Sequence, residues 1–317
     1  MAQTVLVTGA SGFAGSHLLD LLATSDAQLV AWSHRGGHHK PHDAPGAWHA
    51  VDVLDAASVE RAIVDARPDL VYHLAGDAQS GGSWDRLGAT FAVNVRGTQH
   101  LLAAVARHVP SARVVVTGSA LVYEPQDAPI VEDSPLKPES PYAVSKLAQE
   151  TLALRAATLD RLDVIVARPF NHLGPRQSPA FIAASVARQL ALIEAGRGEP
   201  QLRVGNLEAE RDLTDVRDTV RGYRAMADQG RSGGVYNVCR GQGLRMRVLV
   251  QALVDRTRVP VEIVIDPARF RPVDVPRLVG APDRLRSETG WAPQIPLERT
   301  FDDLLEYWRQ RVASGTA

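Results

Sequence analysis

The first half of the chain alternates short apolar runs with longer stretches of helical periodicity. Apolar, largely β-branched runs occupy residues 5–7, 29–32, 70–73, 114–116 and 164–166, and Val51 closes a further predicted strand. Helical periodicity covers residues 12–23, 58–66, 89–107 and 141–158. Because strands that alternate with helices are typical of βαβ units, the pattern predicts an α/β fold with a doubly wound parallel sheet.

Beyond Arg168 the elements become shorter, and proline, glycine and arginine separate them. We predict helices over 179–195, 215–227 and 297–311, and strands near 204 and over 235–238. The sequence therefore predicts a Rossmann domain over 1–168 and a smaller mixed C-terminal substrate-binding lobe over 169–317. Segments near 214–240 are expected to return to the Rossmann core.

Charge and cysteine content exclude several classes of function. The 317 residues include 35 Lys and Arg against 36 Asp and Glu, a formal charge of −1, so we expect neither a nucleic-acid nor a membrane partner. A single cysteine, Cys239, excludes an internal disulfide framework and a cysteine-cluster metal site, and it favours the cytoplasm. Five histidines between His34 and His49 lie among turn residues, so we read them as a loop and predict no metal.

A glycine-rich turn follows the first predicted strand and opens the first predicted helix. Gly9 permits a tight turn, Gly12 lets the backbone approach a pyrophosphate, and Gly15 allows close packing of helix and sheet. The helix N-terminus adds unpaired N–H groups for an anion. We therefore predict a dinucleotide site that also includes Ser11, Phe13 and Ala14.

The end of the second predicted strand indicates which dinucleotide binds. NAD-preferring proteins of this fold place a carboxylate there to accept hydrogen bonds from the ribose 2′-hydroxyl. This chain has Ser33, His34 and Arg35 instead, which suit a 2′-phosphate. We expect NADP(H) to be preferred, with NAD(H) possible.

Tyr142 and Lys146 lie four residues apart at the start of a predicted helix, so they share one face. The chain has only three lysines, Lys40, Lys137 and Lys146, among its 35 basic residues. An ammonium beside a tyrosine favours the phenolate, and such a pair can act as a general acid or base. Ser119, after the fifth strand, is the expected third catalytic member, which orients a carbonyl oxygen.

Several motif blocks together resemble the extended short-chain dehydrogenase/reductase family, and the likeness covers nearly the whole chain. The blocks are residues 8–15, 73–76, 94–98, 117–119 and 141–146. Three later blocks, residues 168–175, 204–218 and 271–276, resemble the branch of this family that acts on GDP-mannose derivatives.

The resemblance implies roles for further residues. It assigns cofactor contacts to Asp52 and Val53 at the adenine, and to Leu74, Ala75, Asn94, Thr117 and Arg168, in addition to Tyr142 and Lys146. It assigns contacts with a GDP-linked sugar to Ser119, Asn171, Arg211, Arg271 and Asp274. It also implies a homodimer.

The residues after Ser119 distinguish two activities of this branch. A 4,6-dehydratase of the family has a carboxylate close to its catalytic hydroxyl residue, whereas Ala120, Leu121 and Val122 stand here. The resemblance therefore implies NADPH-dependent reduction of the C4 ketone of GDP-4-dehydro-6-deoxy-D-mannose, giving GDP-D-rhamnose or its C4 epimer. The alternatives are a nucleotide-sugar 4-epimerase, a GDP-mannose 4,6-dehydratase with its acid elsewhere, and a non-catalytic dinucleotide-binding redox sensor.

Overall fold

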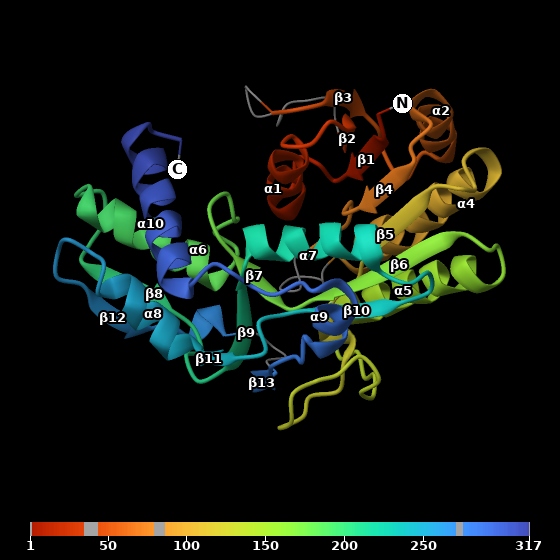
Figure 1. Ribbon diagram of the computed structural model, residues 1–317. Helices are drawn as coiled ribbons and strands as arrows, with labels where there is room; N and C mark the ends of the chain where they lie inside the picture. Colours follow the sequence, from red (N-terminus) through yellow and green to blue (C-terminus); the bar gives the residue numbers. More distant parts are fainter. Residues whose placement is uncertain (1, 35–43, 79–85, 271–274, 317) are drawn as a thin grey trace.

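The computed structural model describes residues 2–34, 44–78, 86–270 and 275–316 of the chain. Its largest element is a seven-stranded sheet in which every neighbouring pair of strands is parallel (Figure 1). In spatial order the strands are β10 (Val235–Val238), β6 (Asp163–Pro169), β5 (Arg113–Thr117), β4 (Leu70–His73), β1 (Thr4–Thr8), β2 (Gln28–Ser33) and β3 (Ala47–Ala50).

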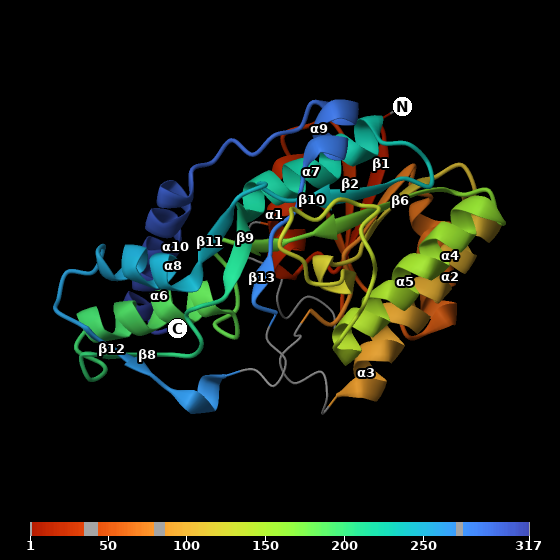
Figure 2. The same cartoon turned by 90° about the horizontal axis from the view of Figure 1, so that it is seen from below.

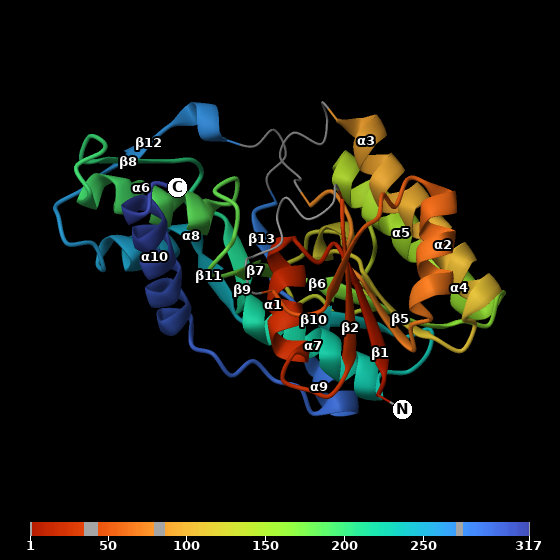
Figure 3. The same cartoon turned by 90° about the horizontal axis from the view of Figure 1, so that it is seen from above.

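Helices cover both faces of this sheet (Figure 3). In β1, Val5 and Val7 pack into the core beneath one group of helices, and Leu6 packs into the core beneath the other. The first group contains α1 (Phe13–Leu22), α7 (Val216–Gln229) and α9 (Asp283–Thr289), and the second contains α2 (Ala56–Ala66), α4 (Thr98–His108) and α5 (Pro141–Thr158). The inner strands are buried on both faces, which fits their almost continuously apolar sequences, whereas the edge strand β3 is largely exposed.

The predicted helix over 89–107 forms, but its middle turn is wider than an α-helix. It consists of α3 (Leu87–Phe91), a π-helical segment η1 (Ala92–Gly97) and α4. Such π-turns are rare and occur frequently at functional sites. Here the wide turn carries Asn94, whose side chain is fully buried. Hydrophobic periodicity does not reveal this change of helical pitch.

A smaller lobe lies beside the large sheet (Figure 2). Its helices α6 (Ile182–Glu194), α8 (Met246–Val254) and α10 (Leu297–Ala313) share one apolar core. Its central strand β9 (Glu210–Asp215) pairs in parallel with β7 (Asn171–Leu173) and β13 (Arg277–Leu278), and antiparallel with β11 (Gly243–Arg245); β8 (Gln201–Val204) pairs with β12 (Glu262–Ile265). The predicted doubly wound sheet and smaller mixed lobe are confirmed.

The chain crosses between the two parts more than once. After β9 it returns to the large sheet, where α7 packs against α1 and β10 pairs with β6. Asp215 begins α7 as its N-cap, and its Oδ1 accepts the amide of Arg217 at 2.8 Å. Among the described residues, no helix combines the length and the apolar composition that crossing a membrane requires.

Candidate active site

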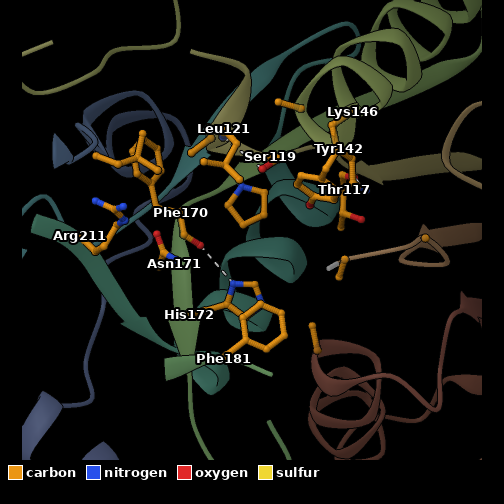
Figure 4. Close-up of a pocket in the computed structure, with 18 of the residues that line it drawn as sticks. Thr117, Ser119, Leu121, Tyr142, Lys146, Phe170, Asn171, His172, Phe181 and Arg211 are labelled. Carbon is orange, nitrogen blue, oxygen red and sulfur yellow. Dashed lines mark hydrogen bonds between the residues drawn. The ribbon is translucent and has the colours of Figure 1, made fainter. Parts of the chain in front are cut away.

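A cavity of about 360 Å³ lies between the glycine turn, the carboxyl ends of the central strands and the smaller lobe. In Figure 4, Ser119, Tyr142 and Lys146 lie on one side, and Asn171 and Arg211 lie across the cavity. Ligands of doubly wound folds bind at the carboxyl ends of the strands, which is where this cavity opens.

The glycine turn packs tightly against neighbouring backbone because its glycines lack side chains. Gly9 has φ of +65°, and a Cβ on it would lie 2.7 Å from the amide nitrogen of Ala75. A Cβ on Gly15 would lie 2.3 Å from the carbonyl oxygen of Gly9. Helix α1 has no side-chain cap at Gly12, so no side chain occupies its first N–H groups. This donor set fits a pyrophosphate. Gly9, Gly12, Phe13, Ala14 and Gly15 line the cavity, whereas Ser11 does not contribute to its wall.

The predicted adenosine end of the site lies at the carboxyl ends of β2 and β3. Ser33 is buried there, and His34 Nδ1 lies 3.8 Å from Asp52 Oδ1. Val53 packs against Gly97 in the wide turn of the helix. Arg35, the third residue expected at a 2′-phosphate, lies outside the described residues.

Helix α5 places Tyr142 and Lys146 together as the spacing predicts. Ser140 caps the helix by accepting the amide of Ala143 at 3.2 Å, and Pro141 occupies its first turn. The Lys146 ammonium lies 6.0 Å from the centre of the Tyr142 ring. Both side chains are buried, and both line the cavity.

Ser119 joins the pair from the end of β5. Its Oγ accepts the amide of Leu121 at 3.2 Å, so its proton stays available for another acceptor. A hydrogen bond to Ser119 favours the Tyr142 phenolate, but burial outweighs it and raises the pKa of Tyr142 to about 12. Burial also lowers the pKa of Lys146 to about 8. Burial therefore favours the protonated tyrosine in this site, and stabilisation of the phenolate by the ammonium stays a prediction.

The other predicted cofactor residues differ in whether they reach the cavity. Leu74 and Thr117 line it, and the Thr117 carbonyl accepts Lys146 Nζ at 2.9 Å. Ala75 uses its amide on Thr8 Oγ1 at 3.1 Å. Asn94 lies behind the wall, where its Nδ2 donates to Ser145 Oγ at 2.9 Å. We therefore assign Asn94 to supporting α5.

The structure contradicts the expectation that Arg168 binds the cofactor. Its Nε donates to Glu150 Oε2 at 2.8 Å, and Nη1 donates to Tyr123 Oη at 2.7 Å and to the Glu132 carbonyl at 2.9 Å. Arg168 is 4% exposed and does not line the cavity. Its position in a motif block reflects a buried ion pair that joins β6 to α5. The sequence alone could not pair it with a glutamate 18 residues earlier.

On the substrate side, Asn171 and Arg211 both line the cavity. Arg211 Nη1 also donates to the Glu210 carbonyl at 2.9 Å. Arg271 and Asp274 lie outside the described residues. Sequence reasoning missed several polar and aromatic residues of the wall: Lys137, Glu139, His172, Gln177 and Phe181. His172 lies within the motif block 168–175, and Gln177 lies just after it. Their position relative to this block was the signal that could have identified them.

The two lobes meet where α1 contacts β7 and the segment that follows it. The ring of Phe13 stacks on His172 with centres 5.5 Å apart and planes at 8°. His17 Nε2 donates to the Pro175 carbonyl at 2.9 Å, so its Nδ1 is free to accept Arg176 Nη2 at 2.7 Å. Burial and the adjacent Arg176 lower the pKa of His17 to about 4, which keeps it neutral. This contact places the substrate-side wall against the glycine turn.

Known proteins resemble this chain over almost its full length. The model of the family described as GDP-mannose 4,6 dehydratase matches residues 6–304. GDP-6-deoxy-D-mannose reductase of Pseudomonas aeruginosa is 37% identical over 98% of this chain and 99% of its own length.

Solved structures agree with this likeness. The structure of RMD from Pseudomonas aeruginosa complexed with NADPH has a TM-score of 0.85 at 35% identity, covering 98% of this chain and 99% of its own. UDP-glucose 4-epimerase of Thermus thermophilus, in complex with NAD, has a TM-score of 0.87 at 27% identity, covering 97% and 99%. With its sheet, glycine turn and serine–tyrosine–lysine site, the chain belongs to the GDP-mannose 4,6 dehydratase family of extended short-chain dehydrogenases/reductases.

Proposed function

We propose that the protein reduces the C4 ketone of GDP-4-dehydro-6-deoxy-D-mannose with NADPH, giving GDP-D-rhamnose or its C4 epimer. The observation that carries this proposal is the wall beside Ser119. The 3₁₀ turn η2 (Ala120–Val122) follows Ser119, and Ala120 and Leu121 present apolar groups to the cavity. The relative named as a GDP-6-deoxy-D-mannose reductase supports the same substrate class.

The carboxylates of the described cavity wall do not supply a dehydratase with an acid in that place. They are Asp77 and Glu139. Asp77 accepts Thr90 Oγ1 at 2.8 Å and lies 3.2 Å from Arg86, so it is already engaged. Glu139 pairs with Lys137 at 3.8 Å and is 40% exposed. Elimination of a C6 hydroxyl needs an acid and a base at C5 and C6, whereas reduction needs only a proton donor at the C4 oxygen.

In the proposed reaction, NADPH supplies the hydride, and the chain supplies binding, orientation and the proton. Ser119 Oγ donates a hydrogen bond to the ketone oxygen, which fixes its position and polarises it. Tyr142 Oη gives its proton to that oxygen as negative charge develops on it. The raised pKa of Tyr142 suits this role, because the hydroxyl holds its proton at neutral pH until an alkoxide forms. In this mechanism Lys146 binds the nicotinamide ribose and then stabilises the tyrosinate.

The cofactor preference is proposed on two grounds. The chain has Ser33, His34 and Arg35 at the end of β2, with no carboxylate to accept a ribose 2′-hydroxyl. The solved RMD structure was complexed with NADPH. We propose NADP(H) as the preferred cofactor and NAD(H) as a poorer one.

The decisive experiment mixes purified protein, the GDP-linked ketone and NADPH, and follows the absorbance of the reduced cofactor. We expect oxidation of NADPH that depends on the ketone, and a product whose C4 configuration NMR then assigns. Conversion of GDP-mannose to the ketone by this protein alone would show a dehydratase. Interconversion of C4 epimers with no net oxidation would show an epimerase, and binding without turnover would favour a redox sensor.

A pair of tyrosine variants tests the mechanism. Tyr142→Phe removes the proton donor, and loss of a general acid predicts about 100-fold to 10,000-fold lower kcat. Tyr72→Phe is the matched control, since the Tyr72 hydroxyl is buried without a hydrogen-bond partner and does not line this cavity. Full activity in Tyr142→Phe would refute the assigned role.

We also propose that the protein is a cytoplasmic homodimer. We further propose that the division between its two domains lies at residue 168. Val144, on the outer face of α5, is 41% exposed, and Leu159, just after that helix, is 69% exposed, so both leave apolar surface for a second copy. The one cysteine, Cys239, is buried and free, which suits a reducing compartment. Light scattering of the purified protein tests the dimer, since a monomer mass at micromolar concentration would refute it.

A further inference from the structure

Behind the cavity wall, five buried polar side chains form one hydrogen-bonded chain. Lys146 Nζ donates to Gln149 Oε1 at 2.9 Å, and Gln149 Nε2 donates to Thr98 Oγ1 at 2.8 Å. Thr98 Oγ1 lies 2.8 Å from His73 Nε2, and His73 Nδ1 lies 2.8 Å from Thr8 Oγ1. Each residue is 5% exposed or less. These hydrogen bonds therefore link the candidate catalytic lysine, Lys146, to Thr8, the residue that begins the glycine turn.

The partners determine where every proton of this chain lies. Thr98 Oγ1 donates its only proton to the Asn94 carbonyl at 2.7 Å, so it accepts from its other partners. His73 must then carry its proton on Nε2, and its Nδ1 accepts the hydroxyl of Thr8. Thr8 Oγ1 in turn accepts the amide of Ala75 at 3.1 Å. Because each of these groups already has its donors and acceptors, the hydrogen-bonded series orients the side chains and does not relay protons.

Gln149 is the link that makes this arrangement possible. Its amide offers an acceptor toward the ammonium and a donor toward Thr98 in one planar group. A carboxylate of the same shape would keep the acceptor and lose the donor, and an aliphatic side chain would lose both. Gln149 is fully buried, so water cannot replace either bond.

We propose that Gln149 is a positioning residue whose amide holds the Lys146 ammonium at the cavity and ties it, through Thr98 and His73, to the glycine turn. The proposal rests on the proposed function for the role of Lys146 itself. Its consequence is that the nicotinamide-side lysine and the phosphate-side turn are held at a constant separation by polar contacts and not by packing alone.

The surroundings of Lys146 make Gln149 important to its charge. Facing groups are Tyr142 on the same helix, Asp77 beyond β4 and the neutral His73 on β4. Burial lowers the pKa of Lys146 to about 8, and the negative charge of Asp77 opposes this shift. Within the described part of the chain, the oxygens that accept directly from the ammonium are the Thr117 carbonyl and Gln149 Oε1.

The test uses the scarcity of lysine in this chain. Lysine isotope-labelled at Cε gives three side-chain NMR signals, from Lys40, Lys137 and Lys146, and Lys146→Met assigns the third. The Lys146 midpoint is measured by pH titration of the full chain without ligands. Gln149→Glu places a carboxylate on the ammonium and is expected to raise the midpoint by about 1–3 pH units. Gln149→Leu removes an acceptor of the charged form and is expected to lower it.

A buried amide elsewhere provides the matched control. Asn237 is fully buried, accepts Tyr123 Oη at 2.7 Å and donates to the Ile130 carbonyl at 2.9 Å, so Asn237→Leu removes two comparable bonds, neither of which involves Lys146. We expect it to lower stability and leave the Lys146 midpoint unchanged. Folded Gln149→Glu and Gln149→Leu variants that both keep the wild-type midpoint would overturn the proposal.

Thr98 keeps the proposal testable if a Gln149 variant fails to fold. Thr98→Ser retains the oxygen and is expected to preserve the wild-type midpoint, whereas Thr98→Val leaves the Gln149 amide without its acceptor and is expected to shift it. Equal midpoints in Thr98→Ser and Thr98→Val would argue that the link does not position the lysine.

Turnover gives a second measurement. Loss of a hydrogen bond to a charged group predicts about tenfold lower kcat for Gln149→Leu, with the KM for the ketone changed by less than about twofold. A wild-type kcat, or a change in KM alone, would contradict the proposal. Absence of ketone reduction by the wild-type protein would refute the proposed function instead, and the NMR titration would still decide the role of Gln149.

Discussion

Acid should destabilise this protein through a histidine in its core. His73 is fully buried at the end of β4, with a hydroxyl partner on each ring nitrogen. Burial, aided by the charge of Lys146, lowers its pKa from 6.5 to about 3. Between these values the unfolded chain binds a proton that the folded chain does not. Stability due to this histidine is therefore complete above pH 6.5 and is lost as the pH falls.

The magnitude follows from the window between the two pKa values. Each pH unit inside it costs about 1.4 kcal/mol, so lowering the pH from 6.5 to about 5 removes about 2 kcal/mol through His73. At about pH 5 the folded ring is still neutral, so this loss of stability is the same for any folded-state pKa below about 4. His17, with its pKa lowered to about 4, contributes a similar loss.

The assay is urea unfolding of wild type and His73→Gln at neutral pH and at about pH 5. The variant starts less stable because its hydrogen bonds are imperfect, but its free energy of unfolding should fall by about 2 kcal/mol less than that of wild type on acidification. Subtracting the acid-induced loss of unfolding free energy in the variant from that in wild type cancels the contributions of other titrating groups. Asp212, whose pKa burial raises to about 6, is one such group. His49→Gln, on the exposed edge strand β3, controls for the substitution. Equal acid losses in wild type and His73→Gln would refute the reasoning.

Three further substitutions test other parts of the site. Gly76→Ala would place a Cβ 2.8 Å from an oxygen of Asn94 and 3.4 Å from Lys146 Nζ. We expect about 1–3 kcal/mol lower stability and a reduced kcat, both measured on the same preparation. An unchanged kcat would contradict the idea that activity depends on a fixed position of Lys146. Arg211→Gln should raise the KM for the GDP-linked ketone about tenfold with kcat retained, if it provides uniform binding of the diphosphate, and steady-state kinetics decides this. Arg168→Met leaves the buried Glu150 carboxylate unpaired and should cost about 3–5 kcal/mol in urea unfolding; normal stability with weakened NADPH binding would restore the cofactor role that the structure contradicts.

Local patterns carried the fold and part of the site because each depends on near neighbours. Alternating apolar runs and helical periods specify βαβ units, and such units have few ways to pack. Tyr142 and Lys146 share a face because helical geometry brings residues four apart together. Both extend from α5 into the cavity, where the structure also places Ser119. The glycines of the turn are identifiable because their spacing coincides with a strand that ends and a helix that begins.

Motif membership did not distinguish a ligand contact from a structural one. Arg168 and Arg211 both stand in blocks that resemble the GDP-mannose branch, yet Arg168 is enclosed by Glu150, Tyr123 and a carbonyl, while Arg211 lines the cavity. The difference lies in what surrounds each guanidinium. Lys137 shows the reverse case, since a polar loop with no motif brings it to the cavity wall.

The sequence by itself determined the order of strands and helices as far as residue 168, the glycine turn and the tyrosine–lysine pair, because these follow from backbone propensity and from spacing within one element. Most of the short strands and the helices α8 and α9 of the later part were not predicted. Tertiary structure alone decided the partners that come from distant elements: Gln149 against Thr98 and His73, Arg168 against Glu150, and His17 against the segment after β7. The pKa values of Tyr142, Lys146 and His73 belong to the same class, because burial is a property of the folded chain and not of any short segment.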